Sequence, residues 1–123
     1  MKNAMVITTL GSVSLVNLET QALETLQDAV GGYVQAIDLD NNQMTMWCNE
    51  EGKMIGLPHN PFGQMFWEKM YDRTDYIVGD IVLTGGADDE GETIGLTDEQ
   101  ITEIMKVVAS VNDFIQPKIT VVY

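Results

Sequence analysis

Basic side chains are scarce in this chain of 123 residues: six Lys and Arg residues stand against nineteen Asp and Glu residues, a formal net charge of −13 at pH 7. No Lys or Arg occurs between Lys2 and Lys53. The shortage of positive charge argues against direct binding to nucleic acid or to anionic membranes, because phosphates would be repelled. The negative electrostatic potential of the chain attracts basic partners or cations instead, and the high net charge also promotes solubility.

Cysteine and histidine are also scarce, with one of each. The lone Cys48 excludes a disulfide within the chain and is typical of a reducing cytoplasm. A nucleophilic thiol needs an activating base, whereas Glu50 and Glu51 would raise its pKa. A zinc site needs about three or four ligands, and His59 has no second histidine to join it. We therefore expect no metal and no cofactor.

Long apolar runs are absent as well. No run approaches the roughly 20 residues that span a bilayer, and the N-terminal segment lacks the apolar region of a signal peptide. We therefore expect a cytoplasmic protein that does not bind membranes. Hydrophobic residues make up 45% of the chain and charged residues 20%, a composition that indicates one folded domain over residues 1–123.

Apolar spacing predicts an α+β fold, with a mostly antiparallel sheet and two or three helices packed on it. The expected strands are 5–10, 12–17, 33–39, 44–48, 53–57, 76–84 and 119–123. The first expected helix, 20–30, is capped by Thr20 and ends at Gly31. The second covers 64–71, and the third starts at a capping box formed by Thr97 and Gln100.

The segment WCNEEGKMIGLPHNP, residues 47–61, holds the cysteine, the histidine, two adjacent carboxylates and a lysine. Its simplest interpretation is a strand, an acidic turn at 49–52 with a positive φ at Gly52, and a return strand. Neighbouring residues of a strand or turn usually point apart, so Glu50 and Glu51 are not expected to act as a paired acid and base. Since no nucleophile with a partnered base can be assembled, we do not expect an enzyme.

The segment 85–95 is acidic and glycine-rich. Counted from Asp88, carboxylates fall at the EF-hand positions 1, 3, 5 and 12, the last being Glu99. Thr93 stands where that loop needs glycine, and no amphipathic helix precedes it, so calcium binding stays open beside a plain solvated loop. Four acids of this loop are candidates for contact with a partner: Asp88, Asp89, Glu90 and Glu92.

Aromatic and methionine residues gather over 62–71. Such residues fill cores, and they also adapt to partner surfaces. Phe66 and Trp67 are therefore candidates for an apolar anchor as well as for the core.

Several pieces of the chain resemble an uncharacterised family common in bacteriophages and plasmids, catalogued as domain of unknown function 3846. They are Leu26, VGGY at 30–33, CNEEGK at 48–53, GLP at 56–58 with Asn60, IVGD at 77–80 and LTDEQ at 96–100. The resemblance covers about residues 18–105, and its most specific piece is Asn-Glu-Glu-Gly-Lys. It implies a mobile-element origin and a bacterial host cytoplasm, but no activity. The segments 62–73 and beyond 111 depart from it.

Two functions from different classes follow as expectations. The first is a non-enzymatic phage or plasmid protein that modulates or inhibits a host protein, for example a defence or DNA-binding protein. Carboxylates would then imitate duplex phosphates, which are spaced at about one charge per 1.7 Å. The alternative is a protein that binds or sequesters a nucleotide signal, in a pocket between subunits lined by the turn Asn49, Glu50, Glu51 and Gly52 together with Tyr33 and His59. A homodimer is a reasonable expectation, since a sheet leaves an exposed edge strand.

Overall fold

Five antiparallel strands form a single sheet in the computed structural model, which describes residues 2–115. The strands are β1 (Asn3–Ile7), β2 (Val13–Asn17), β3 (Val34–Leu39), β4 (Met44–Asn49) and β5 (Ile81–Gly85). Their order across the sheet is β2-β1-β5-β4-β3, so β2 and β3 form the two edges. Three α-helices complete the domain: α1 (Ala22–Val30), α2 (Pro61–Tyr71) and α3 (Asp98–Ile115). The α+β fold expected from the sequence is confirmed.

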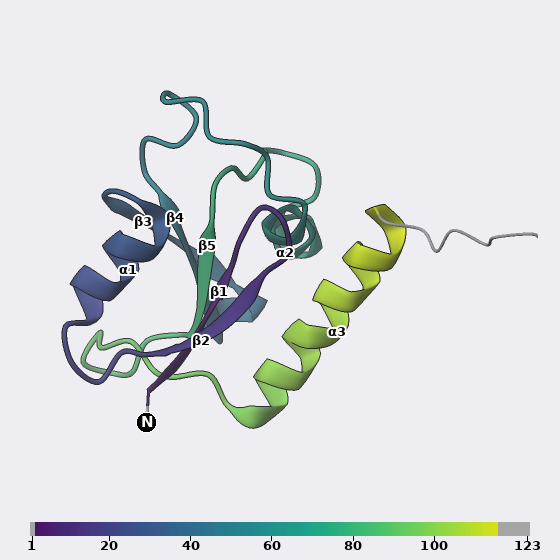
Figure 1. The fold of residues 1–123 in the computed structure, drawn as a ribbon. Coiled ribbons are helices and arrows are strands. Elements are labelled where there is room, and N and C mark those ends of the chain that lie inside the picture. The colour runs from purple at the N-terminus through teal and green to yellow at the C-terminus, as the bar shows by residue number, and fades with distance from the viewer. Residues whose placement is uncertain (1, 116–123) are drawn as a thin grey trace, which may run out of the picture.

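The helices cover both faces of the sheet, with α1 on one side and α2 and α3 on the other (Figure 1). Strand alternation supplies both faces with apolar side chains. In β4, Met46 belongs to the larger core under α2 and α3, whereas its neighbour Trp47 packs against the smaller core under α1. The central strand β5 is buried along its whole length, so the sheet forms the middle layer of three.

Several local predictions are confirmed. The first two strands form a hairpin in which Ile7 lies opposite Val13. Gly31 ends α1 with a φ of 78°, a conformation that glycine adopts without steric cost. The capping box is present: Thr97 Oγ1 accepts from the Gln100 amide at 3.1 Å, and Gln100 Oε1 accepts from the Thr97 amide at 2.9 Å.

The expected return strand at 53–57 is wrong. The Ile55 amide donates to the carbonyl of Glu51 at 3.1 Å, and the Leu57 amide donates to the carbonyl of Gly52 at 2.9 Å. These bonds close successive tight turns in place of a strand ladder. The positive φ falls on Gly56, at 73°, and not on Gly52.

Four element boundaries also differ from expectation. The strand expected at 5–10 is Asn3–Ile7, and Thr9 and Leu10 lie in the turn that follows. Thr20 does not cap α1: the N-cap is Gln21, in a left-handed conformation and without a side-chain cap. The helix expected at 64–71 begins earlier, because Asn60 caps it and Pro61 occupies the first turn. The strand expected at 76–84 begins at Ile81, since Gly79 has a φ of 77° and interrupts the extended backbone.

The expected strand 119–123 lies outside the described residues. Within residues 2–115, no helix has both the length and the apolarity required to cross a membrane.

Candidate functional site

The 50–57 loop, which follows β4, is a closed set of turns anchored to the domain. In addition to the turn bonds within it, the Gly52 amide donates to the carbonyl of Asn49 at 3.1 Å, and the Gly79 amide donates to the carbonyl of Pro58 at 2.7 Å. Leu57 packs against Gly79, where an added Cβ would lie only 2.8 Å from Leu57 Cδ1. The φ of 77° explains a glycine at 79, and the contact with Leu57 fixes the base of the loop.

Asn49 holds the other end of the loop. Its Nδ2 donates to the carbonyl of Val30 at 3.1 Å, and its Oδ1 accepts from the Glu51 amide at 2.8 Å. Next to it, the Glu50 amide donates to the carbonyl of Tyr33 at 2.8 Å. The buried Asn49 amide therefore joins the end of α1 to the loop, and its polar atoms already have partners within the chain.

Two large apolar side chains stand at the tip of this loop. Met54 is 84% exposed and Ile55 is 57% exposed, and the neighbouring Tyr33 is 68% exposed. We call Tyr33, Glu50, Glu51, Met54 and Ile55 the tip surface. Its apolar side chains are solvent-facing although the backbone beneath them is hydrogen-bonded.

A hollow of about 480 Å³ lies beside the tip surface. Tyr33, Asn49, Glu51 and Ile55 line it, together with Gly31, Gly32, Gln27 and Asp28 from the end of α1. The structure thus brings together three of the candidates, Tyr33, Asn49 and Glu51. Of the described residues, no Lys or Arg lines this hollow, so no positively charged side chain is placed there for a phosphate group.

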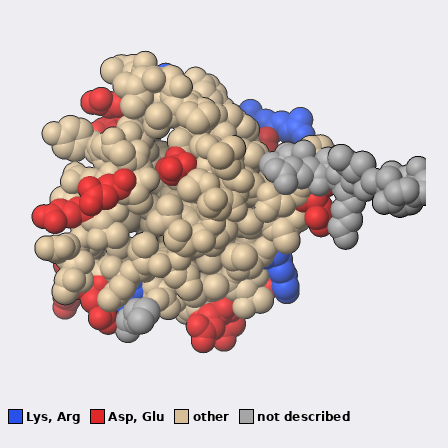
Figure 2. Space-filling model, viewed as in Figure 1, with Lys and Arg blue, Asp and Glu red and all other residues tan. Residues whose placement is uncertain are grey.

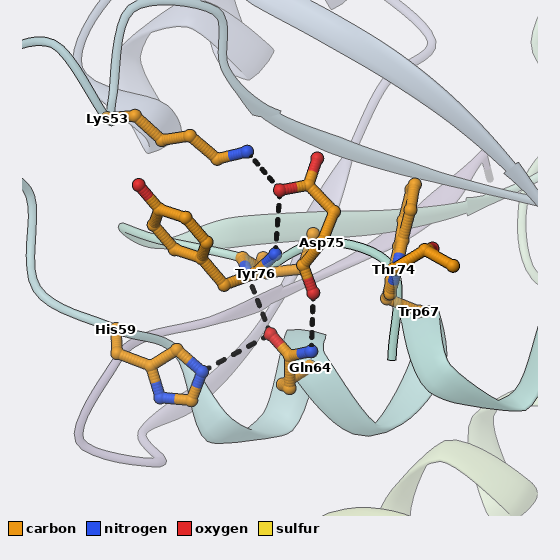
Figure 3. Close-up of polar contacts among 8 residues, drawn as sticks. Lys53, His59, Gln64, Trp67, Thr74, Asp75 and Tyr76 are labelled. Atoms are coloured by element: carbon orange, nitrogen blue, oxygen red, sulfur yellow. Dashed lines mark hydrogen bonds and ion pairs between the residues drawn. The ribbon is translucent and has the colours of Figure 1, made fainter. Parts of the chain in front are cut away.

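A second pocket, of about 280 Å³, lies between β3, β4 and the 74–78 segment. We call it the β3 pocket; its lining includes Gln35, Ile37, Cys48, Glu50, Lys53, Trp67, Asp75 and Tyr76. Lys53 forms an ion pair with Asp75, and its ammonium lies 4.4 Å from the centre of the Tyr76 ring (Figure 3). Hydrogen bonding to Lys53 lowers the pKa of the Asp75 carboxyl.

Helix α2 holds the 74–77 segment at the rim of the β3 pocket (Figure 3). Gln64 Nε2 donates to the carbonyl of Asp75 at 2.9 Å, and Gln64 Oε1 accepts from the Ile77 amide at 2.9 Å. The same Oε1 lies 3.3 Å from Nε2 of His59. His59 therefore contacts α2, and it does not line the hollow formed by Tyr33 and Glu51.

The two adjacent carboxylates and the thiol of the segment lie in different environments. Glu50 lines the β3 pocket and Glu51 lines the hollow beside the tip surface, so the two carboxylates serve different cavities. Burial raises the pKa of the Cys48 thiol, which disfavours the nucleophilic thiolate. Among the described residues, no group of three or more His, Cys, Asp or Glu side chains is placed to hold a metal ion.

The two aromatic candidates of α2 have different environments. Phe66 is 9% exposed and belongs to the larger core, so it is not available as an exposed anchor. Trp67 is half-buried: its indole N–H donates to Thr74 Oγ1 at 3.2 Å, its ring centre lies 4.3 Å from that of Tyr71, and it lines the β3 pocket.

The acidic loop at 88–92 is shaped by its own carboxylate. Asp88 Oδ1 accepts from the amides of Glu90 and Glu92, both at 2.9 Å. Asp89, Glu90 and Glu92 are exposed. The arrangement is an Asx-type turn, and the side chains expected for an EF-hand do not form a metal-holding group among the described residues.

Acidic side chains are spread around the face shown in Figure 2, with uncharged surface between them. They do not gather in one row on this face. Three of the described basic residues pair with acids: Lys53 with Asp75, Arg73 with Glu68 at 3.5 Å, and Lys106 with Glu103 at 3.1 Å.

Sequence reasoning missed Met54 and Ile55 as surface residues, because it placed them on a strand. It also missed the pairing of Lys53 with Asp75. The available signal was the pair of glycines at 52 and 56, whose spacing suits consecutive turns as well as it suits a short strand.

The fold and the site define a small acidic α+β domain with a hydrogen-bonded, partly apolar loop tip and two hollows beside it. The chain belongs to the family described as Domain of unknown function (DUF3846), whose family model matches residues 1–109. The match takes in β1 and β2, which the resemblance over 18–105 left out. No curated protein and no solved structure matches the chain at a significant level.

Proposed function

We propose that this chain is a non-enzymatic binding protein that docks on a basic host protein through the tip surface and thereby modulates or inhibits it. The observation that carries the proposal is the exposure of Met54 and Ile55 on a hydrogen-bonded loop. Exposed apolar side chains gain free energy when a partner covers them, at roughly 25 cal/mol per Å². Because the backbone beneath them is already ordered, little conformational entropy is lost on binding.

Charge supports a basic partner. The chain carries a net charge of −13, and Glu50 and Glu51 flank the apolar tip. Such a field accelerates encounter with a positively charged surface and disfavours acidic competitors. A DNA-binding or defence protein of a bacterial host fits this chemistry. The proposal accordingly places the protein in the bacterial cytoplasm, as an accessory protein of a phage or plasmid.

The test begins with immobilised protein and nuclease-treated bacterial lysate, washed at graded salt. A captured protein is then purified and titrated against three chains: the wild type, the double variant Met54→Ser/Ile55→Ser, and the control Leu10→Ser. Leu10 is a matched control because it is 85% exposed on the β1–β2 turn. We expect the double variant to bind at least tenfold more weakly, which corresponds to about 1.4 kcal/mol, and the control to bind like the wild type. The proposal is contradicted if all three chains bind with equal affinity. It is also contradicted if modest salt releases every captured protein.

A second candidate function is the binding of a small ligand in the hollow formed by Tyr33, Asn49 and Glu51. Its support is that Tyr33, which directly precedes β3, lines one cavity of about 480 Å³ together with Asn49 and Glu51 from the end of β4 and the loop after it. Carboxylate and aromatic groups suit a nucleobase or ribose, whereas the absence of basic lining residues disfavours its phosphates. A panel of nucleosides and nucleotides should raise the melting temperature of the wild type and not that of Tyr33→Ala. If no compound in the panel raises it, this candidate fails.

A further inference from the structure

Among residues 2–115, no strand pairs with the outer edge of β3. β3 is the last strand of the sheet, with β4 as its neighbour. The Glu50 amide bonds to the carbonyl of Tyr33 directly opposite, and this bond fixes the phase of the antiparallel ladder. Residues of the other parity, Val34, Ala36 and Asp38, therefore turn their N–H and C=O groups away from β4.

A described side chain blocks this edge at one end. The Tyr71 hydroxyl donates to the carbonyl of Asp38 at 2.6 Å, which satisfies one outward group. Nothing comparable covers Val34 or Ala36 among the hydrogen bonds of the described residues. The strand also lacks the lysines and prolines with which proteins commonly protect exposed edges.

The β3 pocket lies directly beside this edge. Gln35 and Ile37 of β3 line it, and Trp67 of α2 forms another of its walls. A strand added to β3 would place alternate side chains on this side of the sheet, next to the pocket. An edge strand with a neighbouring pocket is the arrangement by which extended peptides are recognised: backbone bonds give affinity and the pocket gives specificity.

The pocket favours a positively charged side chain. Glu50 and Asp75 line it against a single lysine, Lys53, so its charged groups sum to a net negative value. Ile37 and Trp67 offer apolar surface to an aliphatic stem, and an aromatic ring also attracts a cation. A second copy of the chain is the poorer occupant, because it would bring another −13 charges to the same edge.

We propose that an extended, basic segment of the partner protein adds to β3 as a sixth strand, with an Arg or Lys side chain in the β3 pocket. This inference rests on the proposed function and specifies the chemistry of the partner. β3 begins directly after Tyr33, so such a segment would run into the tip surface.

The probe is a fluorescein-labelled peptide of sequence Thr-Arg-Val-Arg-Val-Arg-Thr, compared with the same peptide carrying Glu in place of Arg. Binding is measured by fluorescence anisotropy at fixed salt. Ala36→Pro removes one outward N–H and leaves the ladder to β4 intact, as proline is tolerated where the N–H faces solvent. The matched control is Leu15→Pro on the opposite edge, where the bond from the Thr8 amide to the carbonyl of Ser12 gives Leu15 the outward parity.

We expect the Arg peptide to bind the wild type and Leu15→Pro with equal affinity. It should bind Ala36→Pro about tenfold more weakly, which is the loss expected for one hydrogen bond and the contacts beside it. We also expect the amides of Val34 and Ala36 to become protected from hydrogen exchange when the peptide is bound. Because Glu50 is exposed, Glu50→Lys should fold normally, weaken the Arg peptide and strengthen the Glu peptide. This second variant decides the question if Ala36→Pro does not fold.

Three outcomes overturn the inference: equal binding of Arg and Glu peptides, no effect of both Ala36→Pro and Glu50→Lys, or a wild-type dimer in sedimentation that Ala36→Pro dissociates. Titration of the captured partner separates the two proposals. If Met54→Ser/Ile55→Ser weakens binding of that partner while Ala36→Pro does not, docking through the tip surface is supported and the added strand is ruled out. If only Ala36→Pro weakens binding, docking through the tip surface is ruled out and the added strand at β3 is supported.

Discussion

Replacing Asn60 by Ala should destabilise the domain strongly, because one buried amide joins three segments. Asn60 is 0% exposed. Its Nδ2 donates to the carbonyl of Ile7 at 3.2 Å and to that of Gly79 at 2.9 Å. Its Oδ1 accepts from the amides of Phe62 and Gly63 at the start of α2, each at 3.0 Å. The side chain thus caps α2 and ties it to β1 and to the turn before β5.

The magnitude follows from these four bonds. Loss of a helix N-cap costs about 1 kcal/mol. Each buried carbonyl that loses its donor costs about 1–3 kcal/mol. The sum for Asn60→Ala is roughly 3–7 kcal/mol, a large part of the roughly 5–15 kcal/mol by which a typical domain is stable.

The assay is urea unfolding at pH 7, followed by far-UV circular dichroism, with Asn60→Asp as the second variant. Aspartate keeps an acceptor for the Phe62 and Gly63 amides and is favoured at a helix N-terminus. It cannot donate, and it directs oxygen toward the carbonyls of Ile7 and Gly79. We therefore expect Asn60→Asp to remain well below the wild type in stability. An alanine variant that loses less than about 1 kcal/mol, or an aspartate variant as stable as the wild type, would refute the reasoning.

Three further predictions concern the loop and its surroundings. Asn49→Ala should cost about 1–3 kcal/mol in urea unfolding, because it leaves the carbonyl of Val30 without its donor; an unchanged midpoint would contradict this. The buried Cys48 should react with a disulfide reagent at least about 100-fold more slowly in the native chain than in urea, since burial raises its pKa, and equal rates would show that the thiol is accessible. Asp75→Asn should lower the unfolding free energy by less than about 1 kcal/mol, as for other exposed ion pairs. Because Lys53 lowers the pKa of Asp75, this difference should be full above the ordinary aspartate pKa of about 3.9 and vanish as pH falls through the lower folded value; a difference that persists in acid would contradict the assignment.

Local signals predicted the parts of the fold that local interactions determine. The alternation of Met44, Met46 and Cys48 gives β4, and the reciprocal bonds of Thr97 and Gln100 start α3. The strand prediction for 53–57 was wrong because the apolar residues of this segment fit the period of a strand as well as they fit consecutive turns. What decides the conformation is the left-handed Gly56, together with the packing of Leu57 on a distant glycine, and neither is visible in a local pattern.

The candidate site was less predictable, because it depends on contacts between distant segments. Lys53 and Asp75 are 22 positions apart, and only the folded chain brings them together. Exposure was equally hidden: methionine and isoleucine are usually buried, so nothing in the composition of the loop indicates that Met54 and Ile55 face solvent. Tyr33, by contrast, was a sequence candidate that the structure places beside this tip.

The residues that carried the family resemblance divide by what they do in the structure. Asn49, Asn60 and Gly79 hold backbone segments in place through buried hydrogen bonds and a close approach. Met54 and Ile55 lie between two of the resembling pieces, 48–53 and 56–58, and make no such contribution, since both side chains are largely exposed. A substitution at these two positions should therefore change what the loop binds without changing how it folds. Under the proposed function, the most specific piece of the motif supports the binding surface, and the choice of partner depends on the two exposed apolar side chains and on the strand edge beside them.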